Sequence, residues 1–547
     1  MRTIRRLTVA TTSLLTVAAL AACSSGSGSG AQDAASTTPV SGGSATWAVA
    51  AEPSCFAPAF DDVLADRAIT RNFVDSLVYQ EQDGTFSPWL ASQWQTSDDG
   101  ATYTFSLRND VKFSNGAVLD AAAVKANLDY TRDSAHGSSY AGLLGSVKSI
   151  KADGSTLTIT LSQADSSLLS SLSSVALGII DPASIKDGKD LCTPGKKLAG
   201  SGPFVLDSYT RGSQVVFKQN TDYAWAPQSL SHDGPAYLDE VTYKFIAEDS
   251  TRTGALQSGQ VQAISGVPAL SVAGLTRSDD ITYTDGPASS STFGLTVNGS
   301  SENAPWDNVE LRKAFRDSFD LDTIVKAIYK GQKTRAWSWV GKDSAEFDTT
   351  LKGSWGNHVD AANTALDAAG WSTRDSEGFR TKDGQRLSLK VTYDADSVRD
   401  QRDTLIEAIQ DAAKQNTGIE VDFTTPTWAA LSADIAAGNW SVYPGSYGKV
   451  DYANSVIGTW AGYFYGASQW KPTEAVDLAQ DAVTTTDADQ YAKALDGIQQ
   501  YLVNDQALFI PLVESTFQIA AGSALHGTGF DYSSGVPDSN YNVWLSK

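Results

Sequence analysis

Residues 77–128 hold the sequence pattern that most restricts how this chain folds. Residues 102–107 alternate polar and apolar side chains at the period of a half-buried strand, and the Asp-Asp-Gly at 98–100 before them is a turn signal. Residues 109–116 repeat the strand and turn signals, and Asp120 occupies the N-cap position of an amphipathic helix. The stretch therefore predicts two hairpins followed by a capped helix, and it contains no catalytic motif.

The length and charge of the chain limit the class of protein. At 547 residues the chain exceeds what one hydrophobic core usually organises, so we expect two or three domains. It has 63 acidic against 41 basic residues, a net charge of −22, whereas nucleic-acid binding requires a basic surface. We expect no nucleic-acid partner and interpret the acidity as a solvated, solubilising surface, with steering of cationic ligands as the alternative.

The N-terminus predicts export and a lipid anchor. Residues 1–22 combine three arginines with an uncharged apolar run over 7–20, the pattern of a signal peptide. The Leu-Ala-Ala-Cys that ends at Cys23 resembles a bacterial lipobox, in which the cysteine becomes the lipidated first residue of the mature protein. Residues 23–42 are rich in Gly and Ser and predict a flexible tether. An ordinary signal with an incidental cysteine and a twin-arginine signal are the alternatives.

With Cys23 lipidated, only Cys55 and Cys192 remain. In an exported protein we expect two such cysteines to form a disulfide, with two free thiols as the alternative. Neither cysteine has a cysteine or histidine neighbour at metal-site spacing, so we expect no metal site and no cofactor.

Landmarks after the opening block follow a recognisable order. They are a Gly-Ser-Gly-Pro strand pair over 200–225, a strand–helix–strand over 239–268, a strand at 293–298 followed by two helices up to 331, and a helix–strand pair over 361–393. The glycines at 200–202 are not followed by the Gly-Lys-Ser/Thr of a phosphate loop, and we interpret them as allowing a close backbone approach. Together with residues 77–128, these pieces resemble the family 5 extracellular solute-binding proteins, the peptide, nickel and opine receptors of ABC importers.

The resemblance implies an α/β periplasmic-binding-protein-like fold of the class II or cluster C type. Two large lobes are expected to meet at a hinge, and the N-terminal lobe is expected to carry an extra subdomain. By this analogy lobe one comprises 43–75, 202–290 and 515–547, lobe two comprises 76–201, and lobe three comprises 291–514. A chain that crosses between lobes more than once suits closure around a ligand.

Residues 439–466 correspond to the specificity segment of the family. Peptide receptors carry there a tryptophan, an aspartate three residues later that pairs with the peptide's amino group, and then an acidic-Pro pair. This chain departs from the pattern: Tyr447 replaces the tryptophan, Lys449 lies nearby, and Asp451 followed by Tyr452 replaces the acidic-Pro pair. Either Asp451 takes the anchoring part with a shift of one residue, or Lys449 favours an acidic group on the ligand. An exposed loop lysine is the alternative for Lys449.

The resemblance and the aromatic residues of this segment predict the ligand contacts. We expect them from Phe56, Asn298, Trp337, Trp339, Tyr443, Tyr447, Lys449, Asp451 and Trp460.

Enzyme motifs are not evident in the sequence. The four histidines lie far apart, and no nucleophile elbow or Cys/His pairing stands out. We therefore expect no enzyme but a monomeric receptor, held on the outer face of the cell membrane by a lipid on Cys23. It captures an oligopeptide or peptide-like solute for an ABC permease and its ATPase. The alternatives are a receptor for an acidic non-peptide, such as an opine-type metallophore or a sugar acid, and an enzyme or chaperone-like envelope protein on the same scaffold.

Overall fold

The computed structural model describes residues 38–60, 67–185, 191–192, 198–230, 232–446, 451–458, 464, 472–532 and 534–546. Cys23 and the other residues of the predicted signal peptide and the first part of the tether lie outside these ranges. No helix among the described residues is long and apolar enough to cross a membrane.

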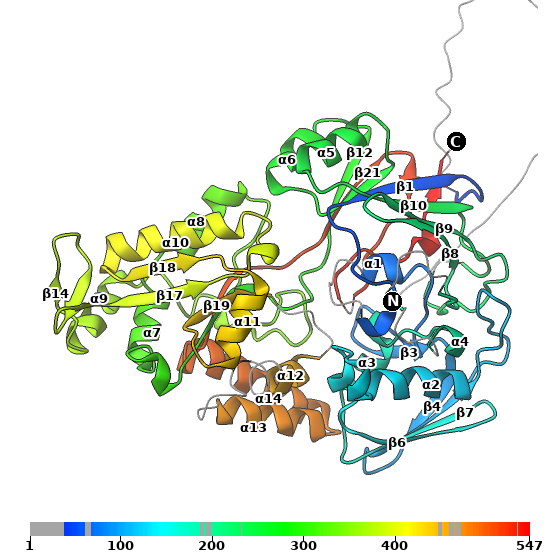
Figure 1. Ribbon diagram of the computed structural model, residues 1–547, viewed down its shortest axis with the longest axis horizontal. Helices are drawn as coiled ribbons and strands as arrows, with labels where there is room; N and C mark the ends of the chain where they lie inside the picture. The colour runs from blue at the N-terminus through cyan, green and yellow to red at the C-terminus, as the bar shows by residue number, and fades with distance from the viewer. Residues whose placement is uncertain are drawn as a thin grey trace, which may run out of the picture.

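A seven-stranded sheet forms the first body, on the right in Figure 1. In sheet order its strands are β12 (Ile281–Asp285), β21 (Gln518–Gly522), β11 (Ala263–Ser265), β1 (Ser44–Val49), β10 (Glu240–Phe245), β9 (Gln214–Gln219) and β8 (Phe204–Thr210). β1 runs parallel to both β10 and β11. Helices α5 (Asp249–Gln257) and α6 (Ala269–Leu275) lie at the β12 side of the sheet (Figure 1).

A four-stranded sheet below it includes two strands from residues 77–128. Its order is β4 (Ala91–Thr96), β5 (Thr102–Leu107), β7 (Thr156–Leu161) and β6 (Val147–Asp153). The alternation in β5 is confirmed, because Tyr103, Phe105 and Leu107 are buried while the residues between them are half-buried. The predicted cap is also confirmed: Asp120 accepts a hydrogen bond of 2.9 Å from the amide of Ala123 at the start of α2 (Ala121–Arg132).

The first two sheets share one hydrophobic core, and the two glycines of the Gly-Ser-Gly-Pro landmark lie at their junction. A Cβ atom on Gly200 would stand 1.7 Å from the carbonyl oxygen of Phe73, and one on Gly202 would stand 2.5 Å from the carbonyl carbon of Phe73. Only glycine permits so close a backbone approach. The interpretation of these glycines as a close-approach site is therefore confirmed.

A five-stranded sheet with its own core forms the second body, on the left in Figure 1. Its order is β18 (Glu420–Thr424), β17 (Ser388–Thr392), β19 (Val442–Gly445), β13 (Phe293–Val297) and β20 (Phe509–Val513). α8 and α10 lie along one face (Figure 1). The helices of this body are α7 (Val309–Arg316), α8 (Leu321–Tyr329), α9 (Val359–Ala368), α10 (Arg402–Thr417), α11 (Trp428–Ala436), α12 (Tyr452–Ser455), α13 (Thr473–Thr484) and α14 (Ala488–Gln500).

Short elements complete the described structure. The hairpin of β2 (Val78–Gln80) and β3 (Phe86–Pro88) precedes β4, and β14 (Thr373–Arg374), β15 (Arg380–Lys382) and β16 (Gln385–Arg386) form a small sheet. β22 (Leu525–His526) pairs with β23 (Trp544–Leu545). Three further α-helices are short: α1 (Arg67–Thr70), α3 (Leu168–Ser173) and α4 (Pro182–Ile185).

The chain passes between the two bodies twice. Residues 286–292 lead from β12 to β13, and residues 514–517 lead back from β20 to β21. Both passages are visible near the centre of Figure 1. They supply the hinge expected of a fold whose lobes are wound from several chain segments.

Candidate functional site

The strand directions make the carboxyl edges of the two large sheets face each other. β13 starts where the chain arrives from the first body, and β19 runs antiparallel to β13 and parallel to β17, which is itself parallel to β18. The carboxyl ends of β17, β18 and β19 therefore point toward the seven-stranded sheet. In that sheet β21 starts at the second passage and is antiparallel to β11, so the carboxyl ends of β11, β1 and β10 lie on the same side as both passages. In α/β sheets ligands bind outside such carboxyl ends.

Two arginines lie at the carboxyl edge of the five-stranded sheet. The guanidinium of Arg402 is buried over the ring of Phe293, 4.3 Å from its centroid, and lies 3.4 Å from the hydroxyl of Ser446. Arg399 is exposed, and among the described residues it has no ion pair with a carboxylate. Burial, and then repulsion from Arg402, nevertheless lower the pKa of Arg399.

The loop that carries Arg399 has an unusual backbone. Asp400 and Gln401 have φ angles of 54° and 57°, in the left-handed region that few non-glycine residues adopt. Asp400 contacts Lys333, with 3.5 Å between its carboxylate and the ammonium. The pKa of Asp400 is lowered overall, since its attraction to Lys333, Arg402 and Arg399 outweighs the effect of burial. Strained backbone of this kind gathers at ligand sites, which favours a binding role for the loop.

Asp451, a predicted ligand contact, is part of the fold. Its carboxylate caps α12 by accepting a 2.8 Å hydrogen bond from the amide of Asn454, and it accepts a 2.9 Å bond from the hydroxyl of Tyr491. The residue is 6% exposed. Burial, and then the negative charge of Asp451, raise the pKa of Tyr491. The two bonds hold the Asp451 carboxylate against α12 and α14.

Tyr443 lies on β19 opposite Thr296 of β13, half-buried, with its ring 5.5 Å from that of Phe464. It is close enough to Arg399 to influence the pKa of that residue. Among the predicted contacts that the structure describes, Tyr443 is the one whose charge acts on Arg399.

Trp337 and Trp339, two of the three predicted tryptophans, differ in their surroundings. Trp337 stacks on Arg335, with the guanidinium carbon 3.4 Å from the ring centroid, and packs edge-on against Trp355. Trp339 is 1% exposed and packs edge-on against Tyr452. The indole nitrogen of Trp339 has no hydrogen-bond partner in the described part of the chain.

Phe56 and Asn298 lie apart from the arginine pair. Phe56 packs in the first core against Tyr209, beside the disulfide that joins Cys55 to Cys192. Asn298 follows the carboxyl end of β13, at the edge of the sheet opposite Phe293, and its amide donates a 2.8 Å bond to the carbonyl of Trp440. Tyr447, Lys449 and Trp460, the other predicted contacts, lie outside the described residues.

Arg399 and Arg402 were not among the ligand contacts predicted from the sequence. A positional signal was available, because both residues follow the strand that ends the predicted helix–strand pair over 361–393, where the chain connects to the next helix, α10. In a parallel unit that connection leaves the carboxyl edge of the sheet.

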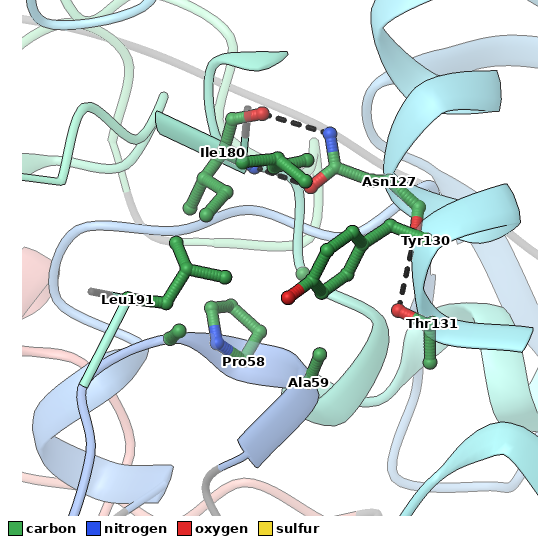
Figure 2. A pocket seen from close by; sticks show the side chains of 10 residues that line it. Pro58, Ala59, Asn127, Tyr130, Thr131, Ile180 and Leu191 are labelled. Carbon is green, nitrogen blue, oxygen red and sulfur yellow. Dashed lines mark hydrogen bonds between the residues drawn. The ribbon is translucent and has the colours of Figure 1, made fainter. Parts of the chain in front are cut away.

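A small pocket lies away from these edges, between residues 57–59 and α2 (Figure 2). Its lining is largely apolar and includes Pro58, Ile180 and Leu191, with the Tyr130 ring turned toward them in Figure 2. Its polar side chains serve the backbone: Asn127 exchanges hydrogen bonds with the backbone of Ile180. Because the side-chain amide of Asn127 is already hydrogen-bonded to the protein, the pocket is better explained as a gap in the packing than as the solute site.

One buried acid lies on the second passage. Glu514 is 3% exposed and accepts a 3.3 Å hydrogen bond from the backbone amide of Lys342. Burial raises the pKa of Glu514 to about 8, so its carboxyl is mostly protonated at neutral pH. A neutral carboxyl is the form that a buried hinge position tolerates.

Comparisons with known proteins agree on one family. The family model for bacterial extracellular solute-binding proteins, family 5, middle, matches residues 85–468. The glutathione-binding protein GsiB of Escherichia coli O1:K1 is 26% identical over 495 residues, covering 85% of this chain and 89% of GsiB.

Solved structures show the same fold. NikA from Brucella suis, in complex with Fe(III)-EDTA, superposes with a TM-score of 0.79 at 23% identity, over 92% of this chain and 100% of NikA. AgaA from Agrobacterium tumefaciens R10, in complex with agropinic acid, gives a TM-score of 0.74 at 22% identity, over 92% of this chain and 99% of AgaA. The expected periplasmic-binding-protein-like fold is therefore confirmed.

Proposed function

Because the chain belongs to family 5 of the bacterial extracellular solute-binding proteins, the receptors of ABC importers, we propose that it captures an acidic, peptide-like solute between its two carboxyl edges. The solute is then handed to a membrane permease driven by its ATPase. The lobe boundaries given by the resemblance, the lipid anchor on Cys23, the position on the outer face of the membrane and a monomeric state belong to the same proposal.

The proposal of an acidic solute depends mainly on Arg399. Arg399 is exposed and, although the charge of Asp400 acts on it, it makes no direct ion pair among the described residues, so it can bind a carboxylate that a ligand brings. Charge-assisted bonds between guanidinium and carboxylate are the strong ones. Buried Arg402 adds positive charge to the same edge. The overall charge of −22 works against non-specific anion binding, so a local pair of arginines is the more distinctive feature.

The peptide-like character rests on the relatives. GsiB is named for glutathione, a small peptide with free carboxylates, and shares 26% identity with this chain. An acidic non-peptide is the second candidate, favoured by Asp451: its carboxylate is engaged by α12 and Tyr491, whereas a buried ammonium on the solute would need a carboxylate partner. AgaA holds such a ligand, agropinic acid.

Calorimetric titration with glutathione, neutral-ended peptides and agropinic acid tests the proposal. We expect glutathione to bind, and Arg399→Gln to weaken binding by roughly 10- to 100-fold, as the loss of a charge-assisted bond of about 1.5–3 kcal/mol would. Arg211→Gln, an exposed arginine on the β8–β9 turn, is the matched control and should bind as the wild type does. Equal loss in both variants would reduce the effect to overall charge, and wild-type affinity in Arg399→Gln would refute the acidic site.

Two further measurements separate the alternatives. Binding of agropinic acid without binding of any peptide would establish the non-peptide receptor, for which Lys449→Ala should also weaken affinity. Recovery of the bound solute unchanged after incubation distinguishes a receptor from an enzyme on the same scaffold.

A further inference from the structure

The four-stranded sheet contacts lobe three (residues 291–514), which holds the five-stranded sheet. The contact is far along the chain from both passages. The amide of Ser166 donates a 2.8 Å hydrogen bond to the carbonyl of Val483, and the Ser166 hydroxyl donates a 3.1 Å bond to the carbonyl of Ala482. Both carbonyls belong to the last turn of α13, where carbonyls lack partners within the helix. A turn of one lobe therefore caps a helix of the other.

A third hydrogen bond lies next to these two. The side-chain amide of Asn454 on α12 donates to the hydroxyl of Ser167, and Figure 1 shows α12 beside α3, which starts after Ser167. Asp165 fixes this turn, because its carboxylate accepts bonds of 3.0 and 2.5 Å from the amide and hydroxyl of Ser167. The turn is held in shape by its own lobe before it meets the other.

Gly100 adds a steric fit to these bonds. It lies in the β4–β5 turn with φ of 67°, and a Cβ atom there would stand 2.9 Å from the Thr486 side chain and 3.1 Å from the Cβ of Ala164. Thr486 belongs to the connection between α13 and α14. The glycine lets this connection seat against the four-stranded sheet.

We propose that Gly100, Ser166 and Ser167 form an interlobe latch with α12 and the end of α13, closed when the lobes hold a solute and open when they part. The four-stranded sheet shares its core with the seven-stranded sheet, whereas the third lobe has its own cores. The latch contacts cited above, between described residues, are three hydrogen bonds and the close approach of Gly100 to Thr486, and polar contacts of this kind are typical of interfaces between mobile domains. The inference rests on the proposed function, because closure around a solute gives the latch its purpose.

Hydrogen–deuterium exchange of the full chain, followed by mass spectrometry, tests the latch with and without glutathione. Two matched pairs of variants are available. Gly154→Ala controls Gly100→Ala, since Gly154 is a turn glycine of the same sheet with φ of 58° and open space around its Cβ position. Ser162→Ala controls Ser166→Ala, since the Ser162 amide and hydroxyl bond a carbonyl of their own lobe, Ser146, at 2.8 and 3.2 Å.

We expect peptides covering Ser166 and 482–486 to exchange roughly 2- to 10-fold faster in the two latch variants than in their controls, the range that follows from one or two lost hydrogen bonds. Glutathione should slow this exchange in the wild type and should dissociate faster from both latch variants. Unchanged exchange in both, or faster exchange spread equally over the strands of the four-stranded sheet, would overturn the latch. If the latch peptides respond to substitution while glutathione leaves them unchanged and does not bind, the latch stands and the proposed solute fails.

Discussion

Glu514 gives the chain a dependence of stability on pH that one substitution removes. Its pKa is about 8 in the folded protein and about 4.5 when the side chain is free in water. Below pH 4.5 the Glu514 carboxyl is protonated in both the folded and the unfolded protein. Between the two values only the unfolded state releases the proton, so the free energy of unfolding falls as pH rises. At about 1.4 kcal/mol for each unit of pKa difference, the loss reaches about 5 kcal/mol at pH 8.

Glu514→Gln retains the size of the neutral acid and an oxygen for the Lys342 amide, but it cannot ionise. Urea unfolding from pH 4 to pH 9 should show wild type and variant alike near pH 4 and a widening advantage of the variant, up to about 5 kcal/mol at pH 8. Taking the difference between the two proteins cancels the other titrating groups. Glu407→Gln, on an exposed position of α10, should show no such divergence. Parallel pH profiles for wild type and Glu514→Gln would refute the assignment of a protonated hinge acid.

Loss of the disulfide and added methyl groups at two glycines can be tested by the same unfolding assay. Replacing Cys55 and Cys192 with serine removes a link between residues 137 apart in sequence, and the chain-entropy model predicts a loss of about 5 kcal/mol; a loss below about 1 kcal/mol would contradict that model here. Gly202→Ala forces a methyl group against the Phe73 backbone and should cost about 1–3 kcal/mol, whereas Gly254→Ala, inside α5 with open space at its Cβ position, should stabilise by about 1 kcal/mol. Equal effects of the two alanines would contradict the close approach.

Features set by neighbouring residues were predictable from the sequence. The alternation in β5 and the Asp120 cap of α2 depend on residues two to four positions apart, and the same holds for the Asp320 cap of α8. The periodicity of side chains and the geometry of a cap are fixed before any tertiary contact forms. For this reason the order of the elements, and with it the family, was readable from the chain.

The candidate site was less predictable because its members meet only through the sheet topology. Asn298 ends the same strand that Phe293 begins, yet the two residues lie at opposite edges of the sheet, and only Phe293 contacts Arg402. The bond between Asp451 and Tyr491 joins residues 40 positions apart on two helices. Aromatic composition indicated the region of Tyr443, but it carried no information about which carboxylates and arginines were already paired.

α12 brings the hinge and the proposed latch within one helical turn. The hydroxyl of Tyr452 donates a 2.9 Å bond to the carbonyl of Ser289 on the first passage, and Asn454, two residues later, bonds Ser167 across the latch. Asp451, which caps the same turn, follows directly in sequence after residues 447–450, which the resemblance predicts to be part of the specificity segment. A displacement of α12 therefore acts on the hinge and on the latch together, because so short a helix moves as one body. A solute that displaces this turn changes the balance between open and closed lobes in proportion to its different affinity for the two states, which is the only way in which binding drives closure.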